Sequence, residues 1–302
     1  MKMKVLLMGM VLVVIMAAVA HADEVDLKYK VARKYLIETK QTITVTVDQA
    51  FKQDTILVMG EGVPKKGTFG GQKRLTAITA AKVKAQRALA ELLHGVNVVS
   101  ETTVQDSELG SDTIKTVVAG FVRGAQVVVQ DWNPAEETAL VILKVGMKGP
   151  KSFAATMYEK ILTEPKVRQE LEKPIFQPSA EVPPPVAAGT PYDGLIIDAT
   201  AYAFRPALIN RIFNPKGEVL YDPAKISQKV LVEQGCGEYT NSVDKARAAL
   251  AKRGVRNPLI VQASGMVSAS DLQVTSETAL QIFSANQSTG FMADARVAFV
   301  LK

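Results

Sequence analysis

The sequence predicts an α+β protein with two domains, and three observations support this prediction. Residues 75–94 (LTAITAAKVKAQRALAELLH) form an alanine-rich pattern with helical spacing. Alternating or β-branched runs on both sides of that helix are typical of strands. Residues 173–191 contain six of the 14 prolines, so this stiff segment is predicted to link a first domain at 23–172 to a second at 192–302.

Residues 1–22 are predicted to be a secretory signal peptide. Two lysines are followed by an apolar run at 5–19 and by a small-x-small pattern, AHA, at 20–22. Cleavage is expected between Ala22 and Asp23. The apolar run is shorter than the roughly 20 residues of a membrane span, although a retained N-terminal anchor is the alternative.

Export determines the expected location of the protein. The only cysteine is Cys236, far from the cleavage site, so a lipid anchor at the mature N-terminus is not expected. The protein is therefore predicted to be periplasmic or associated with the outer membrane without being lipid-anchored. A single cysteine also excludes an intramolecular disulfide, and Cys236 is expected to be buried, with a dimer bridge as the alternative.

The first domain begins with a segment that is hard to assign. Residues 23–53 combine helical spacing near Tyr29 with an alternating pattern at 42–47, so the segment is expected to be part helix and part strand. Residues 55–63 are predicted to be a buried strand. Residues 65–72 (KKGTFGGQ) match no phosphate-binding spacing, so a flexible loop leading into a helix is expected.

The helix at 75–94 is expected to lie close against a sheet, because its apolar face is built largely from small side chains. That face comprises Ile78, Ala81, Ala85, Ala88, Leu89 and Leu92.

Three strands are predicted after this helix. They are 96–104, a long strand at 114–131 bent at Gly120 and Gly124, and 139–147. The resulting order is β-α-β-β-β, with the helix packed on an antiparallel sheet. Residues 153–172 are predicted to be one further helix.

The second domain is predicted to be a small, mixed α+β domain. Its expected hairpin at 212–221 turns at 214–217. The other expected strands and helices follow the apolar runs and their spacing, with strands at 195–199, 230–233, 258–264 and 295–301, and helices at 243–252 and 276–283.

The residues that most enzymes need are scarce. His94 is the only histidine that remains after signal removal, so a histidine-based metal site is not expected. No nucleophile with a partnering base stands out, and no cofactor or small-molecule substrate is implied. The protein is predicted not to be an enzyme, with a hydrolase built on carboxylates alone as a minor alternative. Its mild positive charge does not indicate nucleic-acid binding.

Within residues 55–147, the stretch KVKAQRALAELLHGVNVVSETTV is followed by GFVRGAQVV. With these motifs in that order, the segment resembles the lipoprotein-20 family and the N-terminal domains of the flagellar assembly proteins FlgT and FlgP. The second half, from YDGLIIDA onward, looks like an uncharacterised module that follows such domains in some envelope proteins. The resemblance implies a non-enzymatic envelope protein linked to the outer membrane or to structures near it, flagellar ones included. The family offers no catalytic residues, and this chain departs from its many lipoproteins in lacking a lipobox cysteine.

Two functions are consistent with these observations. The first is a scaffold or assembly factor that contacts other envelope proteins or copies of itself, with Arg123, Gly124 and Trp132 as interface candidates. Core packing is the alternative role for Trp132, and a pair with a carboxylate across the sheet is the alternative for Arg123. The second is a binding module for an anionic polymer or lipid headgroups, with peripheral membrane or cell-wall contact. The residues predicted to make that contact, if they are not simply a solvated surface, are Lys65, Lys66, Lys73, Arg74, Lys82, Lys84 and Arg87.

Overall fold

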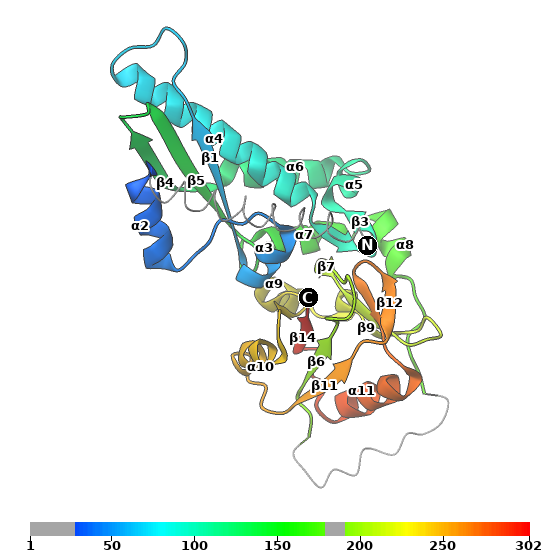
Figure 1. The fold of residues 1–302 in the computed structure, drawn as a ribbon. Coiled ribbons are helices and arrows are strands. Elements are labelled where there is room, and N and C mark those ends of the chain that lie inside the picture. Colours follow the sequence, from blue (N-terminus) through cyan, green and yellow to red (C-terminus); the bar gives the residue numbers. More distant parts are fainter. Residues whose placement is uncertain (1–27, 179–190) are drawn as a thin grey trace, which may run out of the picture. The chain divides into compact units, whose positions relative to one another are not determined.

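The computed structural model describes residues 28–178 and 191–302 and shows an α+β protein, which confirms the predicted class (Figure 1). The predicted signal peptide, with its Ala22–Asp23 cleavage site, and most of the proline-rich segment lie outside the described residues. The described chain forms two compact units. The first comprises residues 28–44, 57–89 and 124–144; the second comprises 45–56, 90–123, 145–178 and 191–302.

The first unit is built on a three-stranded sheet with strand order β1-β5-β4. Its strands are β1 (Thr55–Gly62), β4 (Gln126–Asn133) and β5 (Thr138–Gly146). Strands β4 and β5 are antiparallel, with a bulge between Val127 and Val129. The strands predicted at 55–63 and 139–147 are therefore confirmed.

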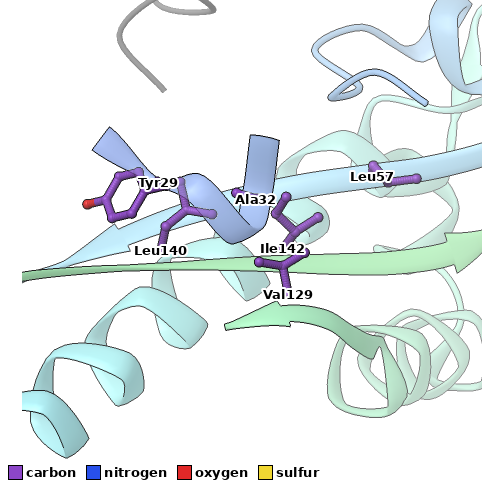
Figure 2. Packing of buried hydrophobic residues seen from close by; sticks show 6 residues of the cluster. All are labelled: Tyr29, Ala32, Leu57, Val129, Leu140 and Ile142. Atoms are coloured by element: carbon purple, nitrogen blue, oxygen red, sulfur yellow. The ribbon is translucent and has the colours of Figure 1, made fainter. Parts of the chain in front are cut away.

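Helix α2 (Lys30–Thr39) packs against the sheet of the first unit. Figure 2 shows Tyr29 and Ala32 against Leu57, Val129, Leu140 and Ile142 of the sheet. The buried carboxylate of Asp131 accepts the backbone N–H of Val31 (2.7 Å) and of Ala32 (3.2 Å). A carboxylate at the first turn satisfies free N–H groups and complements the helix dipole, so the strand fixes the start of the helix.

Helix α4 (Gly71–His94) touches β1 at the level of the backbone. A Cβ placed on Gly60 would lie 2.3 Å from the Ala81 carbonyl oxygen, and one on Gly62 would lie 2.2 Å from that of Ala77. Real side chains do not tolerate such distances, so both strand positions require glycine. The buried stripe of α4 has four-residue spacing and comprises Ala77, Ala81, Ala85, Leu89 and Leu93. The expectation that a small-residue helix lies close on a sheet is confirmed. Of the predicted face, Ala81, Ala85 and Leu89 are buried, whereas Ile78, Ala88 and Leu92 are only half-buried.

The alternating pattern at 42–47 is not a strand. Helix α3 (Val47–Gln53) begins there, and Thr46 is its N-cap. The Thr46 hydroxyl accepts from the Gln49 N–H, and the Gln49 side chain accepts from the Thr46 N–H, which forms a capping box. The prediction of a strand was wrong because threonines suit a strand and a helix start equally well.

The long strand predicted at 114–131 was wrong in its first half, which is helix α6 (Asp112–Gly124). Ile114 and Val118 lie four residues apart and are both buried, and burial of this helical face outweighs the strand preference of the valines. Gly120 and Gly124 therefore lie on a helix rather than at a bend in a strand. The strand predicted at 96–104 is also interrupted, since the chain forms β2 (Asn97–Val99), β3 (Thr102–Thr103) and α5 (Val104–Glu108).

The single helix predicted at 153–172 is two helices, α7 (Phe153–Ile161) and α8 (Pro165–Leu171). Pro165 occupies the first turn of α8. Proline lacks an N–H and disfavours helical backbone in the residue before it, so the first helix ends and a second begins.

The second unit contains a parallel sheet with strand order β10-β14-β6-β11. Helix α10 packs on it, with Leu250 against Ile196 and Ala298. The elements of this layer are β6 (Gly194–Asp198), β10 (Glu238–Thr240), α10 (Val243–Ala251), β11 (Pro258–Gln262), α11 (Ser276–Thr289) and β14 (Val297–Val300).

A mixed sheet with order β12-β13-β8-β9 completes the C-terminal half. Its elements are β8 (Arg211–Phe213), β9 (Val219–Tyr221), η1 (Pro223–Lys225), β12 (Gly265–Ser268) and β13 (Asp271–Gln273). The hairpin predicted at 212–221 is confirmed. The strand predicted at 230–233 is instead helix α9 (Gln228–Gln234), which Ser227 caps by accepting the Val230 N–H.

Segments from both sides of the proline-rich stretch meet inside the second unit. Strand β2 pairs in parallel with β7 (Ala207–Ile209) in a sheet of order β3-β2-β7. At the start of the predicted linker, Ile175 forms a bridge with Val219, and Phe176 is buried. The compact units therefore do not follow the predicted division at 173–191, because proline content marks a segment but does not decide which strands pair.

Candidate functional site

Among the described residues of the second unit, Arg211 and Asp271 are the most deeply buried charges, each with an exposed fraction of 1%. The guanidinium of Arg211 donates to both carboxylate oxygens of Asp271, at 3.1 Å and 2.8 Å. It also donates to the Glu170 carbonyl oxygen (2.6 Å) and the Ser100 hydroxyl (2.7 Å). These hydrogen bonds join β8 to β13, to α8 and to the turn after β2. The guanidinium of Arg211 therefore connects elements of the fold and does not face a ligand.

A second charge network surrounds the half-buried Glu238. Lys148 lies 3.1 Å from its carboxylate and 2.9 Å from that of Asp54, and Arg253 lies 2.6 Å from it. Burial alone would raise the pKa of Glu238, but the two cations outweigh burial and lower it. Glu238 therefore stays ionised and holds two cations together.

Cys236 is buried, as predicted. Its sulfur lies 3.0 Å from the hydroxyl of Tyr239, and its carbonyl oxygen accepts from the Tyr221 hydroxyl at 2.6 Å. The hydroxyl of Tyr158 donates nearby to the Leu208 carbonyl oxygen at 2.7 Å. Burial raises the pKa of all three tyrosines, so they are neutral donors that hold β7 and β10 in place.

Carboxyl ends of parallel strands are common ligand sites in α/β sheets, and Asp198 ends the interior strand β6. Its carboxylate accepts from the Thr200 N–H (2.9 Å) and hydroxyl (2.7 Å) and from the Gln262 amide (3.2 Å). Burial raises the pKa of Asp198, but these hydrogen bonds outweigh it and lower the value. The carboxylate is thus a turn acceptor within the fold.

His94 ends α4, as expected, and its Nε2 lies 3.3 Å from the Glu108 carboxylate. Among the described residues, no three His, Cys, Asp or Glu side chains are grouped so that they could hold a metal ion. Likewise, within residues 28–178 and 191–302, no helix combines the length and apolar character needed to cross a membrane.

The basic side chains predicted for anion contact lie on α4 and on the loop before it. No Asp or Glu occurs between Glu61 and Glu91, although that stretch holds seven lysines and arginines. Six of the seven are exposed, and Lys73 is half-buried, with its Nζ 2.6 Å from the Glu137 carboxylate. The basic surface is therefore defined as Lys65, Lys66, Arg74, Lys82, Lys84 and Arg87.

The loop between β1 and α4, residues 63–70, is shaped by its own hydrogen bonds. The Thr68 N–H and hydroxyl both donate to the Lys65 carbonyl oxygen, at 3.2 Å and 2.6 Å, and the Gln72 N–H donates to that of Phe69 at 3.1 Å. Gly67 has a φ of 79°, a conformation that glycine adopts without strain. Figure 1 shows this loop beyond the ends of β1 and α4.

Sequence reasoning missed the apolar part of this region. Phe69 is 78% exposed, Leu75 66% and Val63 61%. The sequence pattern predicts Phe69 only as part of a flexible loop at 65–72. The signal available in the sequence was an aromatic residue between lysines and glycines, outside any alternating or helical pattern.

The predicted interface residues lie on different secondary-structure elements. Arg123 and Gly124 are exposed at the C-terminal end of α6, where a cation complements the helix dipole. Trp132 is half-buried on β4 and lies opposite Ala139 in the ladder with β5. Trp132 thus lies in the sheet, while Arg123 and Gly124 lie at a helix end.

Comparison with known proteins gives a match to the C-terminal part of the chain. Residues 194–302 match the family model described as Treponema pallidum Tp0624, second domain. No curated protein matches the chain. The match begins at the first residue of β6 and runs to the end of the chain, so it includes the parallel sheet and the mixed sheet described above. The C-terminal half is therefore similar to a module found in another protein.

Proposed function

We propose that the protein is a non-enzymatic scaffold or assembly factor of the cell envelope, which acts through contacts with other proteins or with copies of itself. The resemblance of residues 55–147 to the lipoprotein-20 family and to the flagellar assembly proteins supports a place near the outer membrane or flagellar structures. The expected export signal supports a periplasmic location.

The observation that carries this proposal is that the buried and half-buried polar groups are used inside the fold. Arg211, Glu238 and Tyr239 each hydrogen bond within the protein, and each joins separate strands or helices. Groups used in this way hold the fold together. Their role supports a function that is carried by the surface.

Self-association can be tested at Arg123. Light scattering coupled to size-exclusion chromatography should show concentration-dependent oligomers of residues 23–302, and Arg123→Glu should reduce them. Lys115→Glu is the matched control, because Lys115 is also exposed on α6 and the charge change is equal. A monomer at all concentrations, with no partner recovered by envelope cross-linking, would contradict the proposal.

The basic surface favours a second candidate function, a binding module for an anionic polymer or lipid headgroups. Its six exposed cations lie in a stretch without a single carboxylate, so nothing in the sequence of that stretch neutralises them. Co-sedimentation with cell-wall material or anionic vesicles should decrease as salt rises, because exposed charges are screened. Binding that does not depend on the salt concentration, or the absence of binding, would exclude this candidate function.

A further inference from the structure

We infer that the loop at residues 63–70, together with residues 71–75 at the start of α4, forms a membrane-docking site, which places Phe69 in the surface of a bilayer rich in anionic lipids. The inference rests on the second candidate function and identifies its ligand as a lipid surface. Phe69 is the inserted residue, and Val63 in the loop and Leu75 near the start of α4 are further exposed apolar residues. Lys65, Lys66 and Arg74 contact the headgroups.

The apolar side chains are the first argument. Phe69, Leu75 and Val63 are all more than half exposed, although burial of a side chain of this size is worth roughly 1.5–3 kcal/mol. Hydrogen bonds from Thr68 to Lys65 and from Gln72 to Phe69 fix the turn on both sides of the aromatic ring.

The charges identify the partner. Lys65, Lys66 and Arg74 flank Phe69, and the ion pairs within the described residues do not involve them, whereas Lys73 is paired with Glu137. Cations beside an exposed aromatic residue match the two layers of a bilayer surface, since headgroup phosphates accept the cations and the acyl boundary accepts the ring. A soluble anionic polymer offers the charge without the apolar layer, whereas a bilayer with anionic headgroups offers both.

Two charge-matched variants of residues 23–302 test the position of the contact. Residues 1–22 are omitted because their apolar run would bind lipid by itself. One variant changes Lys65, Lys66 and Arg74 to Gln; the other changes Lys82, Lys84 and Arg87 to Gln. Partitioning onto phosphatidylglycerol-containing vesicles at low salt should fall ~100-fold for the first and less than tenfold for the second. Equal losses would overturn the assignment to the loop.

Phe69→Ala tests insertion, and Leu109→Ala is the control because Leu109 is also an exposed apolar residue, outside the loop. Phe69→Ala should weaken vesicle partitioning about tenfold, and Leu109→Ala should change it less than about twofold. Binding to polyglutamate, which has charge but no apolar layer, should be the same for both variants and the unmodified chain.

A direct probe is Phe69→Trp combined with Trp132→Phe, which leaves a single tryptophan in the loop. Vesicles should shift its emission to the blue, and lipids brominated in the acyl chain should quench it. If the Trp132 change unfolds the chain, the difference spectrum between Phe69→Trp and the unmodified chain gives the same readout. An emission unchanged by phosphatidylglycerol vesicles would overturn insertion.

The outcomes separate this inference from the function on which it rests. Salt-dependent vesicle binding that does not depend on Phe69 keeps the anionic binding function and overturns insertion. Binding to polyglutamate or cell-wall material without vesicle binding keeps that function and overturns the lipid assignment. Vesicle binding that depends on Phe69 and on the loop cations supports both.

Discussion

At the scale of single residues, Gly60 and Gly62 decide how closely strand and helix approach. The absent side chain at each position leaves room for the backbone of α4, 2.2–2.4 Å from where a Cβ would lie. Gly120, in contrast, has no atom within 4 Å of its Cβ position. Glycine is therefore required by the close backbone contact at positions 60 and 62, whereas at position 120 there is room for a side chain.

This contrast gives the first prediction. Gly60→Ala should lower the free energy of unfolding by about 3 kcal/mol, because strand and helix backbones must separate. Gly120→Ala should instead raise it by roughly 0.5–1 kcal/mol, since alanine suits an open helix position better than glycine. Urea denaturation followed by circular dichroism measures both. A Gly60→Ala protein as stable as the unmodified chain would show that the two backbones are not in contact.

Glu238 gives the second prediction, on pH. Its pKa in the folded protein is lower than its ordinary value of 4.5, so its stabilising contribution is present above pH 4.5 and is lost as pH falls through the folded value. Asp222 acts in the opposite direction, because burial raises its pKa. Its contribution to the free energy of unfolding is therefore present at low pH and is lost as pH rises through the raised value. Glu238→Gln should therefore make the free energy of unfolding fall less steeply below pH 4.5. Denaturation curves at several pH values measure this, and an unchanged slope would contradict it.

At the scale of elements, a capping residue decides where a helix begins, and a buried ion pair holds strands and helices against one another. Thr46 determines where α3 begins, in a segment whose alternating pattern suggested a strand. Arg211 joins β8 to β13, to α8 and to the turn after β2. These contacts depend on side chains that are distant in sequence, so no local pattern reveals them.

The third prediction concerns the cap of α3. Thr46→Ala should reduce stability by about 1 kcal/mol, because the Gln49 N–H loses its acceptor, and Thr46→Ser should restore most of the loss. Thermal unfolding distinguishes the three proteins. If serine is as destabilising as alanine, the hydroxyl is not the stabilising group.

The fourth prediction concerns the buried pair. Arg211→Ala leaves the Asp271 carboxylate buried without its partner and should reduce stability by roughly 3–5 kcal/mol. Lys34→Ala is the control, since the Lys34–Glu38 pair is exposed and 3.8 Å apart, and it should have little measurable effect. Similar losses of stability in the two variants would mean that burial does not make the Arg211–Asp271 pair more important than the exposed Lys34–Glu38 pair.

At the scale of the whole molecule, the division into units differs from the division suggested by sequence. The family match covers 194–302, which agrees with a module that begins after the proline-rich segment. The contacts extend further, because β7 pairs with β2 and Arg211 donates to Ser100 and to Glu170. The recurring module is thus embedded in a larger unit of this chain.

The fifth prediction follows from this embedding. A fragment of residues 192–302 should unfold at a lower temperature than the full chain, because β7 loses its neighbour and Arg211 loses two acceptors. Cleavage at a protease site inserted into 179–190 should leave both pieces associated during size-exclusion chromatography, since the contacts across that segment remain. A fragment as stable as the full chain would support independent domains on either side of the linker.

The sequence by itself determined the α+β class, the hairpin at 212–221 and the small-residue helix that lies on a sheet. Each of these depends on neighbours along the chain, such as the turn residues at 214–217 or the four-residue spacing from Ala77 to Leu89. Only the tertiary structure decided the rest. Val117 and Val118 suit a strand, yet packing of the Ile114–Val118 face made them helical, and the pairing of β2 with β7 joined segments that proline content had separated. In the candidate site, the basic residues were visible in the sequence. The exposure of Phe69 was not, because exposure depends on how the whole chain packs around a residue.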